Sequence, residues 1–116
     1  MDVADWSDRP VDEVYPGITR QILQGDRQTL VRYVYAPGSV FPVHSHSQEQ
    51  ITTVISGEIE FVIDGVPIVL RGGQAAVIPA NMPHGARVIG ASVVETFNAL
   101  SPRRDDQPAP ARETGS

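Results

Sequence analysis

The chain has 116 residues, a formal net charge of −5, no cysteine and 41% hydrophobic residues. This length suits one domain with a single core, and the lack of cysteine excludes disulfides and thiolate chemistry. We expect a cytoplasmic protein, because the acidic N-terminus lacks the apolar region of a signal peptide. The acidic balance argues against nucleic acid as a partner, and no apolar run is long enough to span a membrane.

Short β-branched runs separated by Gly, Pro, Asp and Asn follow an acidic N-terminal arm at residues 1–13. The expected strands are Ile18–Leu23, Thr29–Tyr35, Gln50–Ile55, Glu58–Ile63, Val66–Leu70, Ala75–Ile78, Val88–Ile89 and Ser92–Phe97. No stretch has sustained helical periodicity, so the pattern predicts an all-β sandwich or barrel over residues 14–104. Residues 105–116 are rich in Pro, Ala and polar residues, and we expect a disordered tail there.

All three histidines lie in one pattern with the spacing of metal ligands: His44 and His46, then Gln50, then His84. On a strand that runs on through this segment, His44, His46 and Gln50 would share one face, because side chains alternate. The turn Pro79–Pro83 can bring His84 back over them. Imidazole is the commonest protein ligand for transition metals. The alternative is that these histidines are ordinary strand and turn residues without a metal.

The ligand set predicts one divalent transition metal per chain, with Mn, Fe, Co, Ni and Zn all compatible. Glu49 would point away from the histidines and would ligate in place of Gln50 only if the strand slipped by one residue. A neutral Gln50 leaves the charge of the metal uncompensated, which favours Lewis acid chemistry. It also leaves open that the site has lost its metal.

Three charged residues inside strands are candidates for chemistry on a substrate. Glu95 shares a strand face with Val93 and Phe97, and on a cavity-lining face it would be a partly desolvated acid or base with a raised pKa. Arg32 and Arg87 could each clamp a substrate carboxylate. The alternative for all three is an exposed strand position.

Glycines and prolines frame the candidate ligands at fixed intervals. The two patterns are Gly38-x5-His44-x-His46-x3-Gln50-x6-Gly57 and Gly73-x5-Pro79-x-Asn81-x2-His84. They resemble the two motifs of the cupins, with Gln50 where Glu is usual and Asn81 where Gly is usual. Asn is the next best residue for a positive φ. The chain is therefore similar to small single-domain metal cupins from about Val14 to Arg104, which implies a double-stranded β-helix, or jelly-roll, barrel.

Within the cupins, four segments look like the uronate-linearising enzymes of pectin and alginate breakdown: His44–Ile51, Gly57–Phe61, Asp64-Gly65 and Ile78–Ala86. That resemblance implies a divalent metal held by three His and one Gln, and the ring opening of 4,5-unsaturated uronates to linear keto-sugars. It also implies an active-site Asp-x-Phe pair on the last strand and an Arg in a following Ser-Pro-x-Arg sequence.

The catalytic segment can be aligned with these enzymes in two ways. In the first, Glu95 and Phe97 take the Asp-x-Phe place, and Arg104 follows after three additional residues. In the second, the Ser101-Pro102 frame is kept, and Asn98 and Leu100 replace Asp and Phe. We take Glu95, Phe97 and Arg104 as the catalytic candidates and Arg32 and Arg87 as candidates for substrate binding.

The three-His, one-Gln spacing equally resembles the manganese cupin hydroxynitrile lyases. We therefore expect isomerisation or lyase chemistry on a small oxygenated substrate, such as a sugar acid or a carbonyl compound. The alternatives are a metal-dependent dioxygenase and a non-enzymatic metabolite-binding cupin. We also expect a homodimer, with Trp6–Val14 contributing and the face that carries Tyr33 and Tyr35 lying in the core or at the interface.

Overall fold

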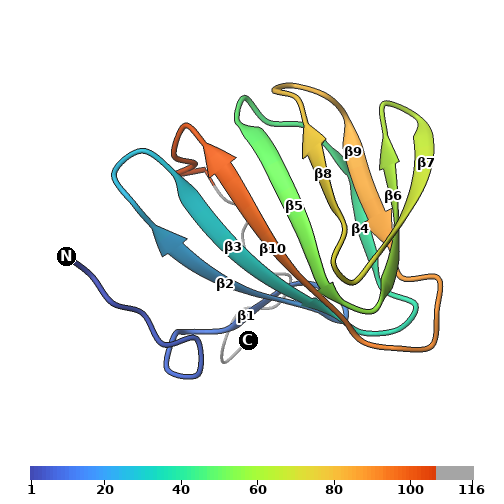
Figure 1. Cartoon of the computed structure of the whole chain (residues 1–116), viewed down its shortest axis with the longest axis horizontal. Helices are drawn as coiled ribbons and strands as arrows, with labels where there is room; N and C mark the ends of the chain where they lie inside the picture. The colour runs from blue at the N-terminus through green and yellow to red at the C-terminus, as the bar shows by residue number, and fades with distance from the viewer. Residues whose placement is uncertain (107–116) are drawn as a thin grey trace.

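The computed structural model describes residues 1–106, and in this range the chain forms two antiparallel sheets that face each other (Figure 1). The six-stranded sheet has the order β1 (Asp12–Tyr15), β2 (Ile18–Gln24), β3 (Thr29–Tyr35), β10 (Val94–Ser101), β5 (Glu49–Ser56) and β8 (Ala75–Ile78). The four-stranded sheet has the order β4 (Val40–His44), β9 (His84–Arg87), β6 (Glu58–Ile63) and β7 (Val66–Arg71). The predicted all-β jelly roll is confirmed.

The hydrophobic core lies between the two sheets and follows from strand alternation. In β3, every second side chain is buried, so that Val31, Tyr33 and Tyr35 face inward. Val54 and Val94 pack from the same sheet, and Ile59, Phe61 and Leu70 pack from the opposite sheet. Among the described residues, none forms a helix of the length and hydrophobicity that a membrane crossing requires.

Four strands differ from the sequence prediction. β1 and β4 were not predicted; β4 contains Pro42, which reads as a turn residue, and an irregularity interrupts its pairing with β9 between Phe41 and His44. The strand expected at Val88–Ile89 lies earlier, at His84–Arg87. β10 begins at Val94 and runs on to Ser101 instead of ending at Phe97.

The N-terminal arm packs along the outer face of the six-stranded sheet. The ring of Trp6 lies 5.3 Å from that of Phe97 on β10. Gln21 Nε2 donates to the carbonyl of Trp6 at 2.5 Å, and Arg9 Nη2 donates to the carbonyl of Ile22 at 2.7 Å. The first strand begins at Asp12, two residues before the expected start of the barrel. Of the predicted tail, residues 107–116 lie outside the described residues.

Candidate metal centre

The three histidines converge at one end of the space between the sheets. Their candidate ligand atoms all lie within 4.8 Å of one another. His44 ends β4, His84 begins β9, and the two are direct partners in the antiparallel pairing. His46 follows β4 in the connection to β5, and its ring lies 4.9 Å from that of His84.

The same local contact fixes the tautomer of all three imidazoles. Each Nδ1 lies within hydrogen-bonding distance of a backbone carbonyl two residues away: 2.9 Å for His44 and Pro42, 3.0 Å for His46 and Gln48, and 2.8 Å for His84 and Met82. Because a carbonyl can only accept, each Nδ1 carries the proton and each Nε2 keeps a free lone pair. Within residues 1–106, the buried Nε2 of His84 has no hydrogen-bond partner.

Burial keeps these imidazoles neutral. Desolvation lowers the pKa of His44 to about 4 and also lowers the pKa of His46 and His84 below the usual value. Arg104 contributes to each of these shifts in the same direction, and neighbouring imidazoles contribute to those of His44 and His84. At neutral pH the three rings are therefore unprotonated at Nε2, which is the form that binds a metal.

A tight turn at Pro79–Pro83 brings His84 to the other two histidines. Asn81 has a φ of 64°, as its place in the second motif predicted. Its backbone N–H donates to the carbonyl of His46 at 2.8 Å, and the N–H of Asp64 donates to the carbonyl of Pro83 at 2.8 Å. The turn is thus fixed on both sides, to the connection that carries His46 and to the end of β6.

Gln50 adds a candidate ligand from the opposite sheet. It lies on β5 with its side chain buried, and its Oε1 is 3.0 Å from Nε2 of His46. An amide oxygen and an unprotonated imidazole nitrogen are both acceptors, so they attract each other only through a shared cation or proton. This donor set fits a divalent transition metal.

The structure brings the four predicted ligands together, but the reason given for their proximity was wrong. His44 and Gln50 lie on different strands in different sheets and not on one continuous strand. Glu49 is exposed on the other face of β5, as expected from its parity. The ligands therefore come together through the folding of the two sheets and not through alternation along a single strand.

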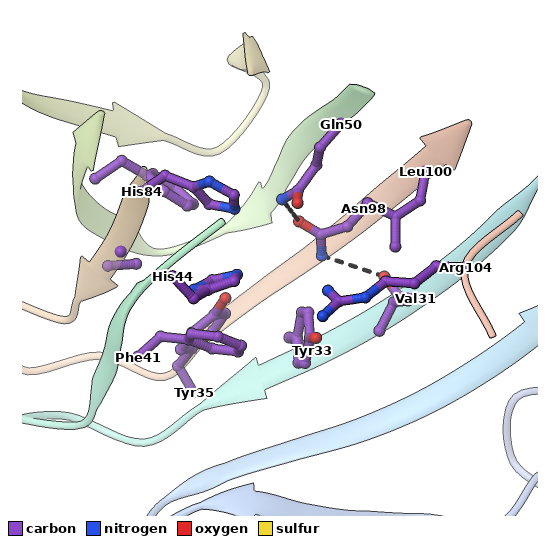
Figure 2. A pocket seen from close by; sticks show the side chains of 13 residues that line it. Val31, Tyr33, Tyr35, Phe41, His44, Gln50, His84, Asn98, Leu100 and Arg104 are labelled. Atoms are coloured by element: carbon purple, nitrogen blue, oxygen red, sulfur yellow. Dashed lines mark hydrogen bonds between the residues drawn. The ribbon is translucent and has the colours of Figure 1, made fainter. Parts of the chain in front are cut away.

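The metal centre opens onto a pocket of about 390 Å³, counted with its open mouth (Figure 2). Its walls are mainly apolar and aromatic and include Val31, Tyr33, Tyr35, Phe41, Phe61, Ala86 and Leu100, with Asn98 among the polar residues. Burial raises the pKa of Tyr33 to about 12 and also raises that of Tyr35, so both phenols stay protonated at neutral pH. Mainly apolar walls with a few polar side chains are typical of small-molecule sites.

Arg104 brings a positive charge to this pocket. Its side chain is 10% exposed, and Figure 2 shows the guanidinium extending among the labelled pocket side chains on the side of Tyr33 and Asn98. Its backbone is tied to the β2–β3 hairpin, because Arg104 N donates to Thr29 Oγ1 and Gln24 Nε2 donates to the carbonyl of Arg104, each at 2.9 Å. Asp106 contacts Nε of Arg104 at 3.4 Å.

Glu95 and Phe97 do not line the pocket, and their predicted cavity-facing placement is wrong. The inward face of β10 carries Val94, Thr96, Asn98 and Leu100. Glu95 lies on the outer face, where it accepts a hydrogen bond from Arg32 Nε at 2.5 Å, and Phe97 packs on Trp6. The second alignment is therefore the one that the structure supports, with Asn98, Leu100 and Arg104 at the pocket.

The two arginines predicted to bind substrate also lie elsewhere. Arg32 joins Glu95 and Gln21 on the outer face of the six-stranded sheet. Arg87 is exposed on the four-stranded sheet and pairs with Glu60 at 2.9 Å. Both occupy the outward parity of their strands, which was the alternative position for each.

Comparisons with known proteins agree with this architecture. The family model of the cupin domain matches residues 31–99. The pectin degradation protein KdgF of Dickeya dadantii is 33% identical over 101 residues, covering 84% of this chain and 89% of the relative. The H2HPP isomerase of Bacillus subtilis is 38% identical over 66 residues, covering 56% of this chain and 28% of that protein.

Solved structures of other proteins have the same fold. The structure of KdgF from Halomonas sp. has a TM-score of 0.83 at 29% identity, covering 91% of this chain and 97% of that chain. An RmlC-like cupin from Shewanella frigidimarina has a TM-score of 0.83 at 25% identity, covering 91% and 95% of the two chains. With its two sheets, its framed histidines and these matches, the chain belongs to the cupin family.

Proposed function

We propose that this chain is a divalent-metal-dependent isomerase or lyase that acts on a small, oxygenated, anionic substrate of the sugar-acid class. The observation that carries the proposal is the meeting of three Nε2 lone pairs, Gln50 Oε1 and the Arg104 guanidinium at one pocket. The similarity to proteins named for pectin degradation and for isomerase activity supports it.

In this proposal the residues divide into two groups. His44, His46, Gln50 and His84 would hold the metal, which supplies a Lewis acid able to polarise a carbonyl or hydroxyl oxygen. Arg104 would bind a substrate carboxylate through two parallel N–H donors, the arrangement that a guanidinium forms best. The apolar walls would exclude water and strengthen both interactions.

The side chains that line the pocket limit which proton transfers this chain could catalyse. Among the residues from 1 to 106 that line the pocket, none is a carboxylic acid, because Asn98 stands where the uronate-linearising cupins carry Asp. An amide cannot accept and return a proton as a carboxylate does. Tyr33 remains a protonated phenol and can act as a hydrogen-bond donor or an acid.

The same observation favours a second candidate function, that of a metabolite-binding cupin that recognises the same anions without converting them. The two functions require the same metal and the same arginine. They differ only in whether a bound substrate turns over.

The test combines binding with turnover. Metal-free protein is loaded with Mn, Fe, Co, Ni or Zn and incubated with 4,5-unsaturated uronates, and the vinyl proton is followed by NMR. We expect its loss to depend on metal and to be abolished in Arg104→Gln. Calorimetric binding of the uronate without turnover would favour the binding function. Consumption of O₂ by the iron-loaded protein would contradict both and indicate a dioxygenase.

A further inference from the structure

Asn98 lies at the centre of a buried hydrogen-bond network next to the metal centre. Its Oδ1 accepts from Thr52 Oγ1 at 2.8 Å and from Gln50 Nε2 at 3.2 Å. Its Nδ2 donates to the carbonyl of Val31 at 3.2 Å and to Thr96 Oγ1 at 3.0 Å. Gln50 Nε2 also donates to Thr52 Oγ1 at 2.8 Å. Figure 2 shows the sequence of contacts from Gln50 through Asn98 to Val31.

The backbone carbonyl of Val31 sets the direction of this network. A carbonyl oxygen can only accept, so Asn98 must turn Nδ2 toward it and Oδ1 away from it. Oδ1 in turn can only accept, so Gln50 must present its Nε2 to Asn98. The remaining atom of the Gln50 amide, Oε1, then faces His46 Nε2 at 3.0 Å. One backbone oxygen thus determines which end of the Gln50 amide faces the histidines.

The opposite orientation of Gln50 would block the metal centre. With its amide rotated by half a turn, Gln50 would present Nε2 to the lone pair of His46 Nε2. That contact is a hydrogen bond, whereas the present contact between two acceptors is unfavourable until a cation lies between them. The metal-free site therefore needs a restraint that keeps Gln50 from rotating.

We propose that Asn98 is the positioning residue that supplies this restraint and holds Gln50 Oε1 toward the metal. The inference rests on the proposed metal site, but it does not depend on the reaction. It assigns a function to a side chain that is only 2% exposed and that cannot serve as an acid or a base. Thr52 supports Gln50 from the side through its hydroxyl.

Two substitutions of similar size at position 98 should affect the orientation of Gln50 differently. Aspartate at position 98 still offers an oxygen to Gln50 Nε2 and to the Thr52 hydroxyl, so Asn98→Asp keeps the orientation of Gln50. Leucine offers no acceptor, so Asn98→Leu leaves Gln50 free to rotate and donate to His46. Metal affinity distinguishes this role from a purely structural one, because either substitution can lower stability in this buried network, whereas only the leucine releases Gln50.

The experiment compares the two variants in metal-free protein. Calorimetry with Mn²⁺ and Zn²⁺ gives the dissociation constants, and circular dichroism confirms folding. We expect Asn98→Leu to bind each metal between about tenfold and a hundredfold more weakly, the range observed when a partner of a metal ligand is removed. Asn98→Asp should stay within about threefold of the unchanged protein. Thr52→Val removes the hydroxyl that supports Gln50 and should also weaken metal binding, whereas Thr53→Val, on the other face of β5, is its matched control and should not.

A second readout does not require metal. In the metal-free protein, the side-chain amide protons of Gln50 should show nuclear Overhauser effects to Thr52, and in Asn98→Leu they should show them to the ring of His46. Asn98→Ala is used for both measurements if the leucine variant does not fold. Unchanged metal affinity in a folded leucine or alanine variant would overturn the inference, as would an equal loss in Asn98→Asp. Failure of the unchanged protein to bind metal would instead contradict the proposed function, and the amide signals alone would then decide the inference.

Discussion

Each imidazole of the metal centre is oriented by the backbone of its own segment. The Nδ1 atoms of His44, His46 and His84 contact carbonyls two residues away, so the free Nε2 atoms do not depend on distant partners. In many metal sites a carboxylate has this role and also adds negative charge. Here the orienting groups are neutral, so a metal held by these histidines would be electron-poor and suited to Lewis acid work.

Loss of one imidazole should disrupt the metal centre without unfolding the chain. His84→Ala removes one candidate ligand from the lining of the pocket. We expect the affinity for Mn²⁺ or Zn²⁺ to fall by more than about a hundredfold, beyond the range for outer partners. Calorimetry on metal-free protein measures this change. An affinity close to that of the unchanged chain would show that the metal is bound elsewhere.

Acid should destabilise the metal-free protein through the histidines. The pKa of His44 is about 4 in the folded chain, whereas an unfolded histidine has a pKa of about 6.5. Between these values the unfolded chain binds more protons, so the free energy of unfolding decreases as the pH falls through this window. Thermal melts at several pH values test this, with His44→Gln expected to show a shallower decline. An unchanged melting temperature from neutral pH down to about 4.5 would contradict it.

Strand β10 shows which structural features could be predicted from the sequence and which could not. Alternating β-branched residues predicted most strands within one or two residues, and the two motifs predicted that the three histidines and Gln50 would lie close together. The end of β10 was placed too early, because an asparagine in a strand reads as a turn residue. Its amide is instead satisfied by four buried groups, a tertiary arrangement that sequence patterns do not contain.

Because Glu95 lies on the outer face of β10, we expect its substitution to leave turnover unchanged, unlike the substitution of a catalytic acid. Glu95→Gln weakens the contact with Arg32, an ion pair in which both side chains are about one quarter exposed. The cost in the free energy of unfolding should be at most about 1 kcal/mol, as for other partly exposed pairs. Metal affinity and turnover should both be unchanged. Loss of turnover with intact metal binding would return Glu95 to the active site.

Gly85 on β9 allows the close approach of β4 that places His44 opposite His84. A Cβ at this position would lie 2.9 Å from the carbonyl oxygen of Phe41 and 3.1 Å from the backbone N of Val43. Gly85→Ala should therefore lower the free energy of unfolding by about 1–3 kcal/mol and weaken metal binding, because β4 must move. Urea denaturation and calorimetry measure both effects. Gly90→Ala is the control, since nothing lies within 4 Å of its Cβ position, and equal stability of the two variants would contradict the argument.

At the scale of the whole molecule, exposed apolar residues lie on both sheets: Val40, Val43, Val66 and Ile68 on the four-stranded sheet, and Ile51, Ile55 and Val77 on the six-stranded sheet. Tyr33 and Tyr35 are buried between the two sheets, so they belong to the core and not to a dimer interface. On the outer face of the six-stranded sheet, Ile51 and Val77 are paired neighbours on β5 and β8, and both are exposed. Exposed apolar residues that adjoin on a flat sheet are typical of a surface that is covered in an assembly.

We expect this outer face to form the interface of a homodimer, with the N-terminal arm beside it at the Trp6 and Phe97 contact. A two-fold axis would pair the same patch on both copies, so one added charge appears twice at the interface. Ile51→Arg should therefore convert the dimer to a monomer at micromolar concentration, as measured by light scattering. Val66→Arg adds the same charge at an exposed apolar position on β7 of the other sheet and should leave the dimer intact. A monomeric unchanged chain would contradict the proposed dimer, and a dimer that persists in Ile51→Arg but not in Val66→Arg would move the interface to the four-stranded sheet.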